Sequence, residues 1–179
     1  MVPEATLQET EAGLVPTGEG WFVLNAQEAR WRHREGRGEC LPFDLELDFP
    51  HFRVNLYVLG PGEPIGMYHW ETVQEDFFVF SGEGLLLIEG EERPLRRWDF
   101  VHCPPGTKHI ILGAGDGPCA VLAIGARDPT STDWGGYAVD ATALRHGAGV
   151  ERETTDAEEA YARFPSPAPA AYRNGWLPG

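Results

Sequence analysis

The feature that most constrains this chain is a series of short apolar runs, separated by turn residues, between Phe43 and about Arg127. The runs read FRVNLYVLG, DFFVFSGEG, LLLIEGEERP, DFVHCPPGT, HIILGAGDGP and CAVLAIG. Short β-type runs at this spacing predict an all-β sandwich or barrel. Glu89-Gly90 directly follows the run Leu85–Ile88, which predicts a hairpin because glycine accepts the positive φ of a tight turn.

We expect three regions along the chain. Residues 1–20 are acidic, rich in Gly and Pro and without periodicity, which predicts a flexible, mobile arm. Residues 21–127 contain the barrel, preceded by a short strand at Trp21–Leu24 and a helical turn capped by Asn25. Residues 128–179 form a C-terminal extension with short helices and a docking tail.

Two short helices are predicted in the extension. DATALRHG has Asp140 as a cap and Gly147 just past its end. In TTDAEEAYARFP, Thr155 and Glu158 stand at capping-box spacing and Pro165 marks the end.

Apolar residues near both ends of the chain predict self-association. The strand at Trp21–Leu24 and the tail residues Trp176 and Leu177 present more apolar surface than one small barrel buries alone. We therefore expect a homodimer in which an arm covers a sheet edge, with tail docking on the barrel or on a second subunit.

Composition excludes several classes of partner. With 14 Lys plus Arg against 28 Asp plus Glu, the net charge of −14 repels nucleic acid and anionic membranes. The first residues lack the basic start and apolar core of a signal peptide, and no apolar run reaches membrane-spanning length. We therefore expect a cytoplasmic protein. The cysteines are three, widely spaced and without a CxxC, which predicts reduced thiols.

Two histidine-containing motifs carry the chemistry. GMYHWETVQEDFFVFSGEG contains His69-x-Glu71-x3-Glu75, and WDFVHCPPGTKHIIL contains Pro104-x-Gly106-x2-His109. Together they resemble the two sequence motifs of the cupin superfamily, over roughly residues 55–125. The matching positions are His69, Glu75, Gly82, Pro104, Gly106 and His109. The resemblance implies a small single-domain cupin with a double-stranded β-helix (jelly-roll barrel) and a metal inside.

The chain departs from the cupin pattern at four places. Glu71 stands where the family usually has its second histidine, and one extra residue separates Gly62 from His69. Trp98 replaces the first glycine of the second motif, and Gly113 replaces its final asparagine. One of the four usual ligands has therefore changed type.

Strand geometry supports a site independently. His69 and Glu71 share one face of a strand because side chains alternate, and Glu75 opens the next strand on the same interior. Two carboxylates inside a barrel are costly unless a divalent cation compensates them. We expect one divalent transition metal ion per chain, Fe, Mn, Ni or Zn, with His69, Glu71, Glu75 and His109 as ligands. The alternative is a solvated barrel mouth lined by Glu71 and Glu75, with His69 as an ordinary strand histidine.

Neighbouring residues favour structural roles. Phe77 and Val79 should form an apolar pocket floor, and Cys103 should be a small buried residue. His102 should lie on the opposite face of its strand. Arg96 and Arg97 could bind an acidic substrate, although solvation at a sheet edge is the simpler interpretation.

Three functions remain open. The first is a metalloenzyme of dioxygenase type acting on an oxygen-chelating organic substrate. The second is a sugar or polyol isomerase or epimerase with Glu71 as general base rather than ligand. The third is a non-catalytic small-molecule-binding module.

Overall fold

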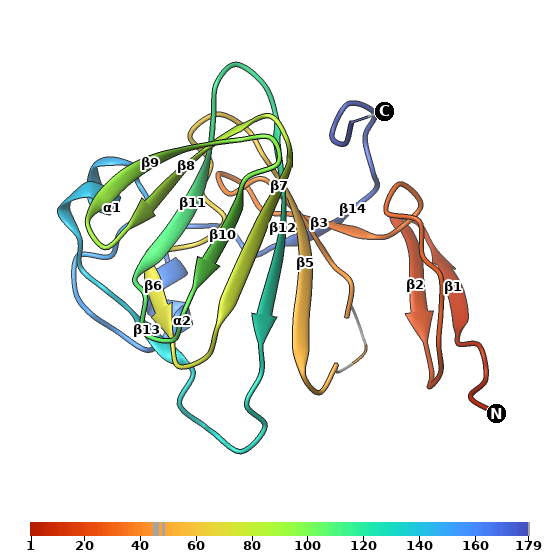
Figure 1. Cartoon of the computed structure of the whole chain (residues 1–179). Helices are drawn as coiled ribbons and strands as arrows, with labels where there is room; N and C mark the ends of the chain where they lie inside the picture. The colour runs from red at the N-terminus through yellow and green to blue at the C-terminus, as the bar shows by residue number, and fades with distance from the viewer. Residues whose placement is uncertain (45–46, 48, 179) are drawn as a thin grey trace.

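The computed structural model describes residues 1–44, 47 and 49–178, and its centre is a sandwich of two antiparallel sheets (Figure 1). The larger sheet has the order β10 (Phe100–Cys103), β7 (Glu75–Ser81), β12 (Cys119–Ala126), β5 (Phe52–Leu59), β4 (Glu39–Pro42), β3 (Trp31–His33), β14 (Ala168–Ala170). The smaller sheet has the order β13 (Gly135–Tyr137), β6 (His69–Glu71), β11 (His109–Ala114), β8 (Glu83–Ile88), β9 (Glu91–Arg96). The predicted all-β double-stranded β-helix is confirmed.

Alternation of side chains explains how the strands form the core. In β10, Val101 and Cys103 are buried between the sheets whereas Phe100 and His102 are exposed. In β7, Phe77 and Val79 point into the same core. This alternation directs every second side chain of these strands into the apolar core and leaves the intervening ones outside it.

The β8–β9 turn has the predicted geometry. Glu89 and Gly90 have φ of 49° and 80°, the two positive values of a tight turn between twisted strands. Ile88 pairs with Glu91 across the turn.

The predicted helices form, with one change of cap. α1 (Ala141–Arg145) begins after Asp140, whose side chain accepts a hydrogen bond from the Ala143 backbone N–H. α2 (Ala157–Tyr161) is capped by Asp156, not Thr155, because the Asp156 carboxylate accepts from the Glu158 N–H at 2.8 Å. Asp is as good a cap as Thr, and here it lies one residue nearer the helix. No helix among the described residues is long and apolar enough to cross a membrane.

The N-terminal segment differs from expectation. Residues 1–20 contain a hairpin of β1 (Thr6–Thr10) and β2 (Gly13–Thr17), which projects beside the sandwich in Figure 1. Trp21–Leu24 is not a strand, since only Trp21 makes a single bridge, to Glu4. The turn after Asn25 does form, with the Asn25 side chain accepting from the Gln27 N–H. The division into arm, barrel and extension stays a prediction.

The C-terminal tail packs on its own chain. Trp176 lies edge-on to Trp31, with ring centroids 5.2 Å apart, and Leu177 packs in the same cluster. Trp31 is fully buried there. The tail therefore covers the barrel flank near β3 and β14.

Candidate metal centre

Two histidines and one glutamate meet inside the sandwich. His69 begins β6, Glu75 begins β7 and His109 begins β11, and His69 and His109 are register partners. The Nε2 atoms of His69 and His109 lie 3.1 and 3.2 Å from the same oxygen, Oε2 of Glu75. One ligand atom from each residue lies within 4.8 Å of the other two. The structure thus brings together three of the four predicted ligands.

The orientation of both imidazoles suits a metal. Nδ1 of His69 lies 2.8 Å from the Met67 carbonyl oxygen, and Nδ1 of His109 lies 3.0 Å from the Thr107 carbonyl oxygen. Because a carbonyl only accepts, each Nδ1 carries a hydrogen and donates it. In the neutral rings the Nε2 lone pairs then face the Glu75 carboxylate. Such an arrangement of three electron-rich atoms requires a cation between them, either a metal ion or added protons.

His109 provides the sharpest test of fit. Its Nε2 is buried and has no hydrogen-bond partner with acceptable geometry, although Glu75 is close. A buried orphan nitrogen is costly in a protein interior and is satisfied by a metal ion. The donor set of two imidazoles and one carboxylate fits a divalent transition metal.

Without metal, protons take the place of the cation. Burial opposes protonation of His109, but the Cys103 thiol and the Glu75 carboxylate outweigh burial and raise the His109 pKa to about 9. Burial likewise opposes protonation of His69, and Glu75 raises its pKa. Burial disfavours ionised Glu75, yet the two imidazoles bring its pKa well below the usual range.

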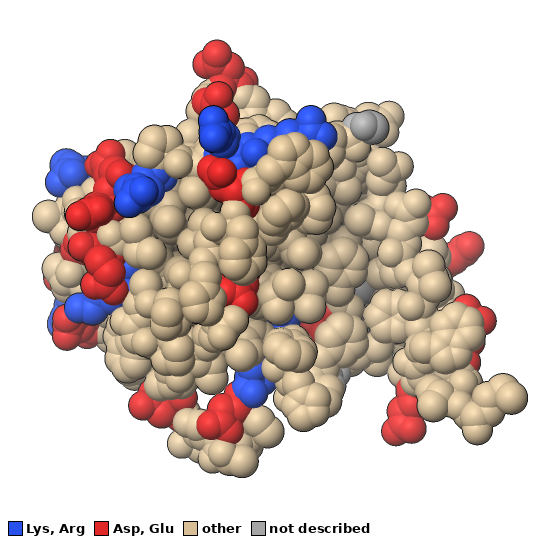
Figure 2. All heavy atoms as spheres, in the orientation of Figure 1, with Lys and Arg blue, Asp and Glu red and all other residues tan. Residues whose placement is uncertain are grey.

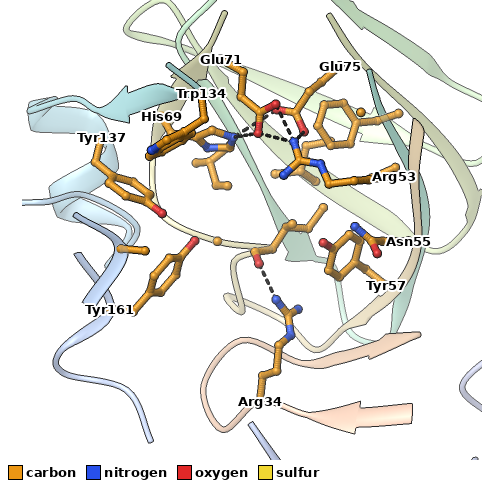
Figure 3. A pocket seen from close by; sticks show the side chains of 18 residues that line it. Arg34, Arg53, Asn55, Tyr57, His69, Glu71, Glu75, Trp134, Tyr137 and Tyr161 are labelled. Atoms are coloured by element: carbon orange, nitrogen blue, oxygen red, sulfur yellow. Dashed lines mark hydrogen bonds and ion pairs between the residues drawn. The ribbon is translucent and has the colours of Figure 1, made fainter. Parts of the chain in front are cut away.

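Glu71 lies beside this group rather than in it. Both its carboxylate oxygens lie 2.6 Å from Nη2 of Arg53, and its Oε1 is 3.9 Å from Nε2 of His69. Burial and the charge of Glu75 raise the Glu71 pKa, while Arg53 opposes the rise. Figure 3 shows Arg53 reaching across to both carboxylates, 4.0 Å from Oε1 of Glu75.

Sequence reasoning missed Arg53 and its neighbours on β5. Arg53, Asn55 and Tyr57 alternate along FRVNLYVLG and all line the pocket. Polar residues at every second position of an otherwise apolar strand were the available signal. The motif spacing does not include them because β5 precedes both motifs.

The candidate metal centre opens into a cavity of about 330 Å³ (Figure 3). Phe77 contributes to its apolar wall as predicted, together with Ile110, Ile111 and Ala123. Val79 was expected beside Phe77 but is buried in the core and does not line the cavity. Its remaining lining includes Asn55, Tyr57, Trp134, Tyr137 and Tyr161. The C-terminal extension therefore forms one wall, through the segment before β13, β13 itself and α2.

Residues 55–125 match the sequence model of a family described as the cupin domain. This segment of the chain is a cupin domain. The match runs from within β5 to near the end of β12 and includes the three converging residues.

The individual proteins to which the chain is similar are distant in sequence. The chain is 26% identical over 95 residues to the oxalate-binding protein of Thermotoga maritima, covering 51% of this chain and 78% of that one. It is similar to a putative sugar phosphate isomerase from Acidithiobacillus ferrooxidans, with 27% identity, a TM-score of 0.46 and coverage of 50% of this chain and 58% of that one. It is also similar to a sugar phosphate isomerase of Silicibacter pomeroyi, with 28% identity, a TM-score of 0.48 and coverage of 53% of this chain and 62% of that one. The chain spans less than two thirds of either isomerase structure.

The structure accounts for two departures from the cupin motifs. Trp98 has φ of 78°, a left-handed conformation that glycine adopts without steric cost. A Cβ at Gly113 would lie 2.2 Å from the Gly60 carbonyl oxygen, so an asparagine side chain has no room there. Gly113 also exchanges backbone hydrogen bonds with Gly62 and Glu63, in the loop that carries the extra residue.

The other residues considered lie where the alternation predicts. Cys103 is buried beside His109, and His102 points outward to Asp76, with Nδ1 2.7 Å from its carboxylate. Arg96 and Arg97 are exposed outside the cavity lining.

Proposed function

We propose that this cupin is a small metalloenzyme of dioxygenase type. Its ligands for one divalent ion per chain are His69, Glu75 and His109. The supporting observation is that both imidazoles donate through Nδ1 to carbonyls and direct Nε2 at one carboxylate oxygen. Two histidines and a carboxylate form the facial set of non-haem Fe(II) oxygenases, which leaves coordination positions open.

A bound Fe(II) ion would supply a centre at which an oxygen-chelating substrate and dioxygen are held together. The chain supplies the rest. Phe77, Ile110 and Ile111 exclude water from one side of the cavity, and Tyr57, Tyr137 and Tyr161 offer hydroxyl groups for orienting a polar substrate. The oxalate-binding relative supports an oxygen-chelating ligand, since oxalate presents two adjacent carboxylates.

Glu71 serves as a proton acceptor in this proposal, and Arg53 is its positioning residue. A partly desolvated carboxylate 3.9 Å from His69 Nε2 can take a hydroxyl proton from a substrate bound at the metal. The fourth-ligand role expected from the sequence requires Glu71 to exchange Arg53 for the metal. Titration with Fe(II) or Mn(II) distinguishes the roles: unchanged affinity in Glu71→Gln with lost turnover identifies the base, and weakened affinity identifies the ligand.

Oxygen consumption tests the enzymatic proposal directly. Anaerobically Fe(II)-loaded protein should consume dioxygen with at least one member of a panel of catechols, 1,3-diketones and 2-oxo acids. The matched controls are His109→Gln, which should lose metal and activity, and His102→Gln, which should keep both. Panel members that bind without any oxygen uptake would contradict dioxygenase chemistry.

The isomerase alternative rests on the raised Glu71 pKa, which suits a general base. Metal-dependent exchange of a substrate carbon-bound hydrogen with D₂O, without oxygen uptake, would favour it. Tight binding with neither exchange nor oxygen uptake would indicate a binding module.

We also propose a homodimer. The face seen in Figure 2 is largely uncharged at its centre, with acidic and basic groups toward its rim. Trp98 and Phe100 are 59% and 63% exposed beside the edge strand β10, and Trp21 is 51% exposed. An unpaired sheet edge with exposed aromatics suits contact with a second copy. Light scattering at micromolar concentration should give twice the chain mass, and a monomer would reject the dimer.

A further inference from the structure

Two buried arginines lie at the far end of the cavity from the metal centre. Arg34 and Arg37 come from the turn between β3 and β4, and only 7% and 8% of their surfaces are exposed. Arg34 lines the cavity, and Figure 3 shows it on the side opposite Glu71 and Glu75. Neither motif nor strand alternation drew attention to this turn.

Neither arginine has a carboxylate partner among residues 1–44, 47 and 49–178. Arg34 donates from Nη1 to the Ile65 carbonyl and from Nη2 to the Arg37 carbonyl, each at 2.6 Å. The Nε of Arg34 and the Nε of Arg37 are buried without a hydrogen-bond partner. A guanidinium has five N–H donors, so Arg34 keeps three for another acceptor.

Aromatic rings give only partial compensation. The Arg34 guanidinium lies 4.8 Å from the Tyr57 ring centroid, and that of Arg37 lies 4.4 Å from the Tyr161 ring. Such contacts recover a small part of the cost of desolvating a cation. Burial and the neighbouring charge of Arg34 lower the Arg37 pKa, which indicates that the pair is under-neutralised. In a chain of net charge −14, two adjacent buried cations without anions are unusual.

Tyr161 connects the arginines to the cavity. Its hydroxyl accepts from the Met67 N–H and lies 2.7 Å from where a Cβ of Gly66 would be. Because Gly66 has no side chain, the Tyr161 hydroxyl can reach the cavity. Gly66 and Tyr161 both line that cavity.

We infer that Arg34, with Arg37 behind it and Tyr161 beside it, forms an oxyanion subsite for the distal carboxylate or phosphate of the substrate. The substrate is then a small organic acid or phosphate ester with an oxygen-chelating group at one end and an anionic group at the other. This deepens the proposed function and rests on it for the chelating end only. A planar guanidinium with free donors matches the geometry of carboxylate and phosphate groups.

The first experiment isolates the subsite from the metal. Metal-free protein in EDTA at pH 8 is titrated with inorganic phosphate by calorimetry. Saturable binding is expected, weakened at least tenfold in Arg34→Met and several-fold in Arg37→Met, and unchanged in the exposed-arginine control Arg96→Met. The tenfold factor is that of one charge-assisted hydrogen bond. Absence of saturable phosphate binding, or equal binding in wild type and Arg34→Met, overturns the subsite whether or not the protein binds metal.

The second experiment uses a matched pair of ligands. Mn(II)-loaded protein should prefer 2-oxoglutarate over 2-oxopentanoate, which has the same chelating head but a methyl group in place of the distal carboxylate, by at least tenfold. In Arg34→Met the preference should vanish while 2-oxopentanoate affinity stays the same. Arg34→Lys, which keeps the positive charge, should retain part of the preference for 2-oxoglutarate. This variant serves as the control in case Arg34→Met does not fold.

The outcomes separate the two proposals. Equal affinity for both ligands, or a preference that persists in Arg34→Met, overturns the oxyanion subsite. If Mn(II) does not bind, the metalloenzyme proposal fails while the phosphate titration still decides the subsite. A distal-phosphate analogue binding better than the distal carboxylate identifies phosphate as the source of the anion.

Discussion

Raising the pH should destabilise the metal-free protein between pH 6 and pH 9. Although burial opposes protonation, the Cys103 thiol and the Glu75 carboxylate hold the folded-state pKa of His109 at about 9, against 6.5 for an unperturbed histidine. The folded state therefore binds this proton more tightly than the unfolded chain. The stabilisation is fully present below pH 6.5 and is lost as the pH rises through about 9.

The size of the effect follows from the shift. A difference of 9 − 6.5 = 2.5 pKa units corresponds to about 3 kcal/mol at about 1.36 kcal/mol per unit. The raised pKa of His69 acts in the same direction. For a chain of 179 residues, about 3 kcal/mol lowers the melting temperature by roughly 6–12 °C.

Urea denaturation of EDTA-treated protein at pH 6, 7, 8 and 9 measures this loss. His109→Gln should show most of the pH dependence removed. The series ends at pH 9 because a second group titrates above it. Burial raises the folded-state pKa of Cys119 from 9.0 to about 11, so above pH 9 the unfolded chain loses the thiol proton before the folded protein does, and the fold is destabilised further. Stability that stays level or rises from pH 6 to 9, or an identical slope in His109→Gln, would refute the reasoning. With saturating metal the slope should shrink or reverse, because metal binds neutral imidazoles.

Three further substitutions test the packing and the charge network by urea denaturation. Gly113→Ala should cost about 1–3 kcal/mol by overpacking against the Gly60 carbonyl, and wild-type stability would contradict that contact. Trp176→Ala should cost about 2 kcal/mol by removing the half-buried indole that packs the tail on the barrel, whereas an undocked tail would give no change. Arg53→Met should cost about 2 kcal/mol at pH 8 by leaving Glu71 unpaired, and Glu71→Gln added to it should restore most of the loss; no rescue would mean that the pair is not responsible.

The sequence was sufficient for the barrel because its information is local. Alternation along DFVHC predicts that Val101 and Cys103 are buried and that His102 is exposed, and the structure agrees. The turn at Glu89-Gly90 is equally local. The helix cap was displaced from Thr155 to Asp156 because adjacent residues can serve equally well as caps.

The hairpin at residues 1–20 shows the limit of periodicity. β1 and β2 are mostly exposed or half-buried, so their sequence lacks the apolar alternation that marks a core strand. Their regularity comes from pairing with each other, as in Leu7 with Pro16. The expected strand at Trp21–Leu24 failed for the opposite reason, since its apolar residues are present but the backbone pairing stops at the single bridge from Trp21 to Glu4.

Part of the candidate site depends on distant pairings. His69, Glu75 and His109 were recognisable because the motif spacing brings three strand starts together. Arg53 and Arg34 act on the cavity from β5 and from the β3–β4 turn, whose positions depend on the register of the larger sheet. Sequence spacing carries no information on that register, and single arginines in a strand or a turn resemble surface residues.

A crystal structure of the protein soaked with Mn(II), with anomalous scattering recorded, tests the central claim most directly. The account predicts one ion per chain, bonded to Nε2 of His69, Nε2 of His109 and a carboxylate oxygen of Glu75. The metal–nitrogen distances should be about 2.0–2.2 Å. An anomalous peak elsewhere, or no peak with Glu75 still bound to two protonated imidazoles, would contradict it.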